Sequence, residues 1–142
     1  DEYVLLLRPH IIISNKIIID KSLEDFIYNV AGYEEISDLY LISDICITDY
    51  SSVMFDFANT RKPLLFFTYD LDHYKDNLRG FYMNFEDEAP GPLLKDNETL
   101  IDSIKNIETI NKSYQEKYDK FYDKFCSFEK GNAAKRIVEK LF

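Results

Sequence analysis

Short apolar runs alternate with amphipathic segments along the first half of the chain. Four of the runs have the length of a strand and end at polar or turn residues: 3–7, 26–30, 45–48 and 64–67. Between the second and third runs, Ile36, Leu39 and Tyr40 share one face at helical spacing, behind acidic residues in the first turn, where the helix dipole favours them. The alternation predicts an α/β fold with a parallel sheet and right-handed crossovers. Residues 11–13 and 17–19 are also apolar and fit either a helix or a strand.

The second half of the chain is mainly helical in its periodicity. Residues 97–107 predict one helix, with Leu100, Ile101, Ile104 and Ile107 on one face. An aromatic stripe then steps by four and three residues, which is typical of core packing: Tyr114, Tyr118, Phe121, Phe125 and Phe128. Gly131 and Asn132 end it, and residues 133–142 predict a last amphipathic helix with Ile137, Val138 and Leu141 facing inward.

The segment from Ser43 to Thr60 contains the candidate chemistry. It predicts a short buried strand over residues 45–48, a polar turn, and a helix whose first turn holds Ser51 and Ser52. Unpaired N–H groups at such a helix start attract anions, and ligands of open α/β sheets lie beyond the carboxyl ends of the strands. The same residues are also ordinary helix caps, as is Asp49, so the spacing alone leaves a phosphate site and structural capping both open.

Composition narrows the function classes. A chain of 142 residues with 46% apolar residues is one domain by length and buries a core. Its 17 basic and 26 acidic residues give a net charge of −9, which argues against nucleic acid and against electrostatic docking on an anionic membrane. Residues 69–92 mix acidic, aromatic and turn residues and predict a loop-rich segment at the functional rim.

Neither the cysteines nor the histidines indicate a metal or a disulfide. Cys46 and Cys126 are expected to be buried structural thiols, because they lie in an apolar strand and an aromatic helix. His73 stands among acidic residues that are typical of a solvated loop, so no metal is expected. The sequence contains no apolar run long enough to span a membrane. The chain opens on an apolar strand without a methionine, which favours a piece of a longer protein.

Several motifs together resemble one family. They are Leu7-Arg8-Pro9-His10, Leu41-Ile42-Ser43-Asp44, residues 47–56 (Ile-Thr-Asp-Tyr-Ser-Ser-Val-Met-Phe-Asp), Phe67-Thr68-Tyr69-Asp70, residues 78–84, Pro90-Gly91-Pro92 and residues 121–126. In these motifs the chain resembles the carboxyl-terminal half of the CDP-glycerol glycerophosphotransferases, the teichoic acid primases and polymerases with their polyol-phosphate relatives.

The resemblance implies a Rossmann-like parallel sheet flanked by helices, the carboxyl-terminal half of a GT-B fold, with residues 1–142 as one nucleotide-donor-binding domain. Residues 112–142 are then expected to pack toward a missing amino-terminal half. The implied reaction transfers glycerol phosphate from CDP-glycerol to the terminal hydroxyl of a teichoic-acid-type polymer or primer and releases CMP. It needs no cofactor, and this part of the enzyme alone is expected to be inactive.

The resemblance also implies roles for single residues. His10 matches the histidine that contacts the donor diphosphate and is the catalytic candidate, Ser51 and Ser52 match the serines that bind the diphosphate, and Asp56 matches the acidic position for the donor ribose or polyol. An imidazolium and helix-start N–H groups would stabilise the charge that builds as CMP leaves. The structural alternatives are a histidine held by a backbone carbonyl and a solvated or capping carboxylate.

Asp49 and Arg79 are secondary candidates. Arg79 either clamps a phosphate or pairs with a nearby carboxylate such as Asp76 or Glu86. The catalytic base is expected outside this chain.

Three functions stay open from the sequence: transfer from CDP-glycerol, transfer from CDP-ribitol or another nucleotide-activated donor, and a non-catalytic binding or assembly domain. The expected partners are the CDP-activated donor, the polyol-phosphate acceptor and the rest of the same protein, without nucleic acid. The family resemblance implies the cytoplasmic face of the bacterial cell membrane, with membrane association through the parent protein.

Overall fold

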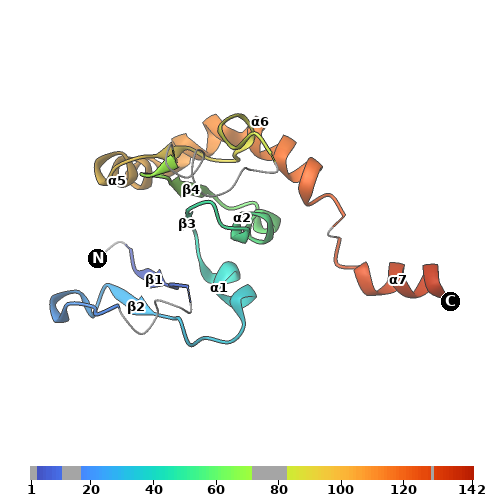
Figure 1. Cartoon of the computed structure of the whole chain (residues 1–142), viewed down its shortest axis with the longest axis horizontal. Coiled ribbons are helices and arrows are strands. Elements are labelled where there is room, and N and C mark those ends of the chain that lie inside the picture. The colour runs from blue at the N-terminus through green and yellow to red at the C-terminus, as the bar shows by residue number, and fades with distance from the viewer. Residues whose placement is uncertain (1–2, 11–16, 72–82, 129) are drawn as a thin grey trace. The chain divides into compact units, whose positions relative to one another are not determined.

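The computed structural model describes residues 3–10, 17–71, 83–128 and 130–142 (Figure 1). Its backbone divides into two compact units, Asp1–Leu39 and Tyr40–Phe142, and each is described by itself. That residues 1–142 form one donor-binding domain stays a prediction.

The first unit contains a pair of parallel strands. Strand β1 (Leu5–Leu7) pairs with β2 (Ile27–Asn29), and a short 3-10 helix, η2 (Lys21–Leu23), precedes β2. The guanidinium of Arg8 donates hydrogen bonds to the carbonyls of Val30 (3.3 Å) and Tyr33 (2.6 Å), so it fastens the end of β1 to the loop after β2.

Both strands of the first unit were predicted, and both are confirmed at slightly shorter lengths. An apolar run such as residues 3–7 is typical of a strand that is buried on both faces, but the three residues of β1 are only half-buried. In the described residues the sheet has two strands, and a pair of strands offers less cover than the centre of a wide sheet. Residues 17–19 form no helix or strand.

The second unit is built on three parallel strands. Their order is β3 (Cys46–Thr48), β4 (Leu64–Phe67), β5 (Leu93–Leu94), with Ile47 opposite Leu65 and Phe66 opposite Leu93. The central strand β4 carries the core: Leu64, Leu65 and Phe66 are almost inaccessible. The predicted strands at 45–48 and 64–67 are confirmed, but Ile47 is 39% exposed, so β3 is not fully buried.

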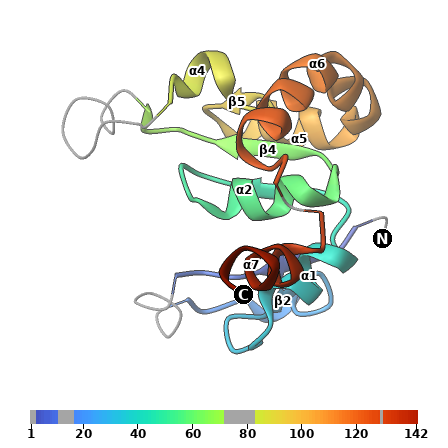
Figure 2. The same ribbon diagram turned by 90° about the vertical axis from the view of Figure 1, so that its right-hand side faces the viewer.

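From residue 36 onward the described residues form these α-helices: α1 (Ile36–Ile42), α2 (Val53–Phe57) with its 3-10 extension η3 (Ala58–Thr60), α4 (Phe85–Glu88), α5 (Asn97–Lys105), α6 (Ile107–Phe125) and α7 (Ala133–Leu141). Aromatic side chains join some of them to one another and to the sheet of the second unit. Phe55 of α2 stacks on Phe121 of α6 at 5.4 Å between ring centroids and meets Phe125 edge-on at 5.1 Å. The aromatic stripe therefore joins α6 to α2. Figures 1 and 2 show the ribbons of the helices and of the strands β3 and β4.

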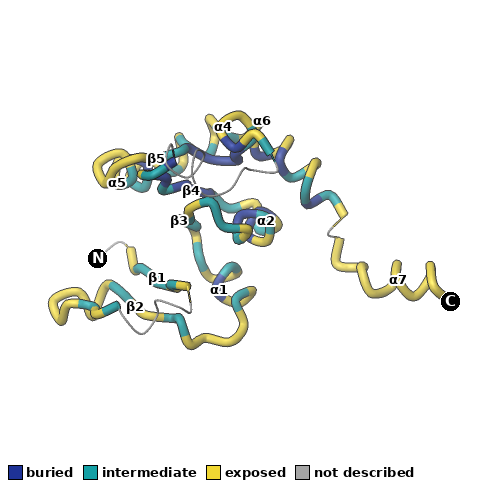
Figure 3. The backbone as a smooth tube through the Cα atoms, in the orientation of Figure 1, coloured by how far each residue is buried: buried dark blue, intermediate teal, exposed yellow. Residues whose placement is uncertain are grey.

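Some residues predicted to be inside are exposed. Ile101 points outward, and Phe128 lies three residues beyond the end of α6, off the helical face that the stripe assumed. Ile137, Val138 and Leu141 of α7 are between 56% and 70% exposed, so their predicted inward orientation is wrong (Figure 3). The helix itself forms as predicted, but in the described part of the chain its apolar face meets no surface that would bury it.

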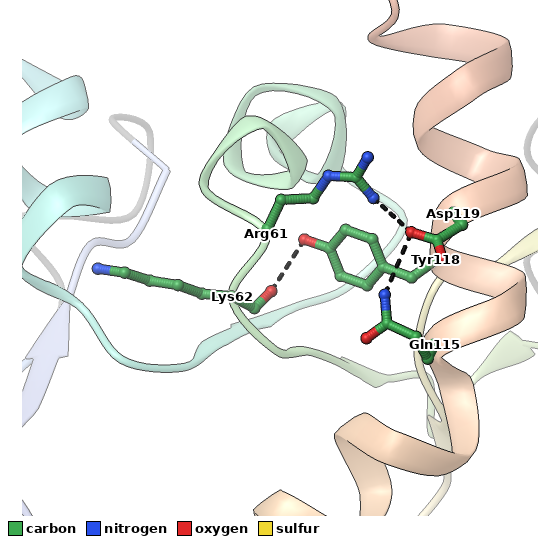
Figure 4. Close-up of polar contacts among 5 residues, drawn as sticks. All are labelled: Arg61, Lys62, Gln115, Tyr118 and Asp119. Atoms are coloured by element: carbon green, nitrogen blue, oxygen red, sulfur yellow. Dashed lines mark hydrogen bonds and ion pairs between the residues drawn. The ribbon is translucent and has the colours of Figure 1, made fainter.

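The amino end of β4 is fastened to α6 (Figure 4). The hydroxyl of Tyr118 donates to the carbonyl of Lys62 at 2.9 Å, and Arg61 pairs with Asp119 at 2.7 Å. Gln115 donates to the same carboxylate at 3.1 Å. The Lys62 ammonium extends away from Tyr118 and donates to two carbonyls near the end of α1. Residues 61–63 form the turn before β4, with Arg61 in the left-handed region (φ 59°).

The loop before β5 presses against β4. Gly91 is buried, and a Cβ atom at this position would lie 1.9 Å from the carbonyl oxygen of Leu64. The next residue, Pro92, accepts a hydrogen bond from the N–H of Phe66 at 3.0 Å. Only a residue without a side chain fits this approach, which lets β5 pair with β4.

Candidate functional site

Two loops leave the sheet of the second unit at the same edge. Residues 49–52 follow β3 and residues 68–71 follow β4, and the strands are parallel neighbours. Ligands of open parallel sheets bind beyond the carboxyl ends of the strands. This edge is therefore where the predicted site residues of the second unit are expected to act, and Ser51 and Ser52 do lie there.

The turn after β3 is held partly by its own side chains. The Asp49 carboxylate accepts from the N–H of Ser51 at 2.9 Å, and the Ser51 hydroxyl accepts from the N–H of Val53 at 3.4 Å. Asp49 therefore has a structural role, and the hydroxyl of Ser51 is partly engaged as a cap. Both findings match the capping alternative for these two residues.

Ser52 differs from its neighbours. It occupies the position before α2, yet its side chain makes no capping hydrogen bond, and the residue is exposed. Asp56 is also exposed and lies four residues later, on the same face of the helical segment as Ser52. A hydroxyl and a carboxylate thus share one accessible face beside the edge of the sheet.

The helix that follows is shorter than the sequence indicated. The predicted helix from Ser51 to Thr60 is an α-helix of five residues, Val53–Phe57, continued by the 3-10 turn η3. Few aligned peptide dipoles add up over such a length, so the macrodipole contributes little. Any anion at this edge is bound by the particular N–H groups and hydroxyls of the turn.

His10 belongs to the first unit. It is exposed and lies three residues beyond the carboxyl end of β1. The expectation that His10 lies close to Ser51 and Ser52 stays a prediction, because these residues belong to different units. Arg79, His73 and Asp76 lie outside the described residues.

Sequence reasoning assigned no role to a pair of residues at this edge. The Tyr50 hydroxyl donates to the Asp70 carboxylate at 2.7 Å, across the two loops. Burial and this hydrogen bond raise the pKa of Tyr50, so its hydroxyl stays protonated and remains a donor. Their positions in the sequence could have identified the pair, because Tyr50 and Asp70 lie two and three residues beyond the ends of adjacent parallel strands.

In the described part of the chain, neither a surface hollow nor any group of metal-binding side chains provides another location for the predicted site residues. A hollow of about 380 Å³ near the end of α6 contains none of the predicted site residues; it is lined by Ser127, Phe128, Lys130, Asn132 and Arg136. Among the residues that the structure describes, no three His, Cys, Asp or Glu side chains are grouped to hold a metal ion. Both cysteines are free thiols, and Cys126 is buried as predicted, whereas Cys46 is half-buried.

Comparison with known proteins decides the family. The model of the CDP-glycerol:poly(glycerophosphate) glycerophosphotransferase family matches residues 1–142. The chain belongs to this family.

Relatives within the glycerophosphotransferase family are close. The teichoic acid glycerol-phosphate transferase of Staphylococcus aureus is 49% identical over all 142 residues, which cover 36% of that protein. The teichoic acid poly(glycerol phosphate) polymerase of Bacillus subtilis is 44% identical, again over the whole chain and 19% of that protein. The chain therefore spans about a third or less of the length of these relatives.

The fold agrees with solved structures of the wall teichoic acid polymerase TagF. One of them superposes with a TM-score of 0.88 at 46% identity, over 96% of this chain and 33% of TagF. A TagF variant soaked with CDPG matches with a TM-score of 0.87 at 46% identity, over 96% of this chain and 34% of that one. The predicted α/β fold with parallel strands flanked by helices, related to the GT-B enzymes, is confirmed.

Proposed function

We propose that this chain is the donor-binding part of a longer CDP-glycerol glycerophosphotransferase. The enzyme transfers glycerol phosphate to the terminal hydroxyl of a teichoic-acid-type polymer or primer and releases CMP. The family match and relatives named as glycerol-phosphate transferases and polymerases support the reaction. The similarity to a TagF variant that was soaked with CDPG supports the choice of donor.

The accessible face formed by Ser52 and Asp56 is the observation that carries the donor-binding role. The Ser52 hydroxyl is not used in capping, and Asp56 lies one helical turn away from it. In this proposal Ser51 and Ser52 bind the diphosphate, and Asp56 binds a hydroxyl of the ribose or the polyol. A carboxylate suits a sugar or polyol because it accepts hydrogen bonds from hydroxyl groups.

The reaction is a phosphoryl transfer. The acceptor hydroxyl oxygen attacks the phosphorus that carries the glycerol, and the bond from this phosphorus to the bridging oxygen breaks. CMP leaves with the electron pair, and the proton of the acceptor passes to a base outside this chain. His10 as an imidazolium and the polar groups of the turn stabilise the negative charge on the departing CMP.

Substitution of Ser52 in the full-length protein tests this assignment. We expect Ser52→Ala to lower kcat/KM for transfer from CDP-glycerol by about 10²- to 10³-fold, the usual effect of losing one such contact. Ser113 is a matched control, because it is an exposed serine of α6 whose hydroxyl donates to the carbonyl of Ile110 in its own helix. Equal activity of Ser52→Ala and Ser113→Ala would refute donor binding at this turn, and transfer unchanged by both Ser52→Ala and His10→Ala would favour a non-catalytic domain.

CDP-ribitol is the second candidate donor. Relatives named as ribitol-phosphate polymerases match at 38% and 30% identity, below the 49% of the glycerol-phosphate transferase. We therefore favour CDP-glycerol. Competition between the two donors for binding to the full-length protein distinguishes them, since the true donor displaces the other at lower concentration.

We place the full-length enzyme at the cytoplasmic face of the bacterial cell membrane, where a CDP-activated donor and a growing polymer would meet. In the described part of this chain no helix has the length and apolar character needed to cross a membrane. Attachment then depends on other parts of the protein. Fractionation of cells that express the full-length protein, with and without a salt wash, tests peripheral attachment.

A further inference from the structure

Tyr50 and Asp70 join the two loops at the carboxyl edge of the sheet. Tyr50 stands inside the polar turn, between Asp49 and Ser51, and its hydroxyl donates to Asp70 at 2.7 Å. We propose that Tyr50 and Asp70 are positioning residues that hold the turn of residues 49–52 in the conformation that binds the donor diphosphate. This inference rests on the proposed function.

The Asp70 side of this connection is anchored in the sheet. The N–H of Thr68 donates to the carbonyl of Leu94 in β5 at 2.7 Å, and the carbonyl of Thr68 accepts from Leu71 at 3.2 Å. Thr68 is fully buried, and Leu71 is nearly so. Asp70 therefore belongs to a loop that is held by buried residues at positions 68 and 71.

The ring of Tyr50 is fixed as well. It meets Phe85 of α4 at 5.9 Å between centroids, and Phe85 meets Phe66 of β4 edge-on at 5.2 Å. Both phenylalanines are buried in the core. The ring of Tyr50 thus links the turn to the core, and its hydroxyl makes a hydrogen bond to a carboxylate, the stronger kind of hydrogen bond.

The turn needs such support because its own side-chain bonds are local. Asp49 and Ser51 accept from N–H groups two residues ahead, and the second of these bonds is long at 3.4 Å. The five-residue helix α2 adds little dipole. Binding of an anion then depends on how accurately the hydroxyls and N–H groups are oriented before the ligand arrives. Because Tyr50 is fixed, it determines how the backbone N–H groups and hydroxyls of Ser51 and Ser52 are oriented.

A matched pair of tyrosine variants in the full-length protein tests the inference. Tyr50→Phe keeps the ring and removes the hydroxyl, and Tyr118→Phe does the same at the opposite end of β4, where Tyr118 donates to Lys62. We expect both variants to melt at a lower temperature. Only Tyr50→Phe should weaken the binding of CDP-glycerol, by about tenfold or about 1.4 kcal/mol, with a matching rise in KM.

Variants of Asp70 supply a conservative rescue. Asp70→Asn retains an oxygen that accepts from Tyr50, so donor affinity should lie between those of the wild type and Asp70→Ala. The double variant Tyr50→Phe/Asp70→Ala should bind CDP-glycerol no more weakly than Asp70→Ala, because the two groups act through one hydrogen bond. If Asp70→Ala does not fold, Tyr50→Phe and Asp70→Asn alone decide.

The outcomes separate the two proposals. Failure of the wild-type protein to bind CDP-glycerol overturns the proposed function and this inference with it. Binding by the wild type together with equally tight binding by Tyr50→Phe overturns the positioning role alone. The same holds if Tyr118→Phe weakens donor binding as much as Tyr50→Phe, because the effect is then one of general stability.

Discussion

A methyl group at residue 91 would collide with the backbone of β4. The Cβ of an alanine there would lie 1.9 Å from the carbonyl oxygen of Leu64 and 2.9 Å from its carbonyl carbon. Since backbone atoms cannot turn aside as a flexible side chain does, the loop or the strand must move by more than 1 Å to reach the shortest separation that real Cβ atoms show, 3.0 Å. That movement breaks the pairing of β5 with β4.

The cost combines overpacking with lost hydrogen bonds. Overpacking of a core costs about 1–3 kcal/mol, and each backbone hydrogen bond adds about 0.5–1.5 kcal/mol. The two bonds at risk join Phe66 to Pro92 and Thr68 to Leu94. We therefore expect Gly91→Ala to lower the free energy of opening at β4 by about 2–6 kcal/mol, a large part of the 5–15 kcal/mol that is usual for a whole domain.

Native-state hydrogen exchange of the full-length protein measures this locally. The amides of Phe66 and Thr68 should exchange about 30-fold faster for each 2 kcal/mol lost. Gly32 and Gly131 are matched controls, because a Cβ at either position meets nothing within 4 Å. Gly32→Ala should change stability by less than about 1 kcal/mol, and Gly131→Ala, at φ +67°, should cost about 1–2 kcal/mol. Unchanged exchange of both amides in Gly91→Ala would refute the close approach.

Three further predictions concern single groups. Thr68→Val should raise the melting temperature, since the buried Thr68 hydroxyl has no hydrogen-bond partner in the described structure; a lower melting temperature would reveal one. Burial raises the pKa of the Cys46 thiol to about 12, so iodoacetamide at pH 8 should alkylate it roughly a thousandfold more slowly than in the unfolded chain, as peptide mass spectrometry would show. The hydrogen bond from Lys124 lowers the pKa of Glu88, so this interaction stabilises the fold above the unfolded pKa near 4.5 and is lost as the pH falls through the folded value. Glu88→Gln should accordingly lower the denaturation midpoint at pH 7 and leave it unchanged at strongly acidic pH.

Apolar periodicity was enough to predict four of the five strands and most of the helices that the structure describes. Leu64–Phe67 was predicted with its observed bounds, because a run of four apolar residues between a proline turn and polar residues permits few alternatives. The spacing of Phe57 and Ala58 in the sequence is also typical of a core-facing side of a helix, and both residues are fully buried. Strand β5 was missed because two leucines between the predicted loop-rich stretch and the next helix are too few to show a periodicity.

The wrong predictions concern contacts between elements, which the periodicity of a single element does not determine. Val138 and Leu141 have the spacing of a buried face, but spacing does not say whether a partner surface is present, and they are exposed. The serine turn was located correctly, whereas the sequence left open which of its residues cap the helix. Which of Ser51 and Ser52 caps the helix depends on backbone angles, and the bond between Tyr50 and Asp70 depends on the register of β3 against β4.

The central strand of the larger sheet is secured by a tyrosine hydroxyl beyond each end. Tyr118 bonds to Lys62 before β4 begins, and Tyr50 bonds to Asp70 after it ends. Because the two fastenings lie at opposite edges, substitutions that adapt one edge to a new substrate leave the other intact. The strand can therefore stay anchored at its amino end while the loops beyond its carboxyl end change in sequence.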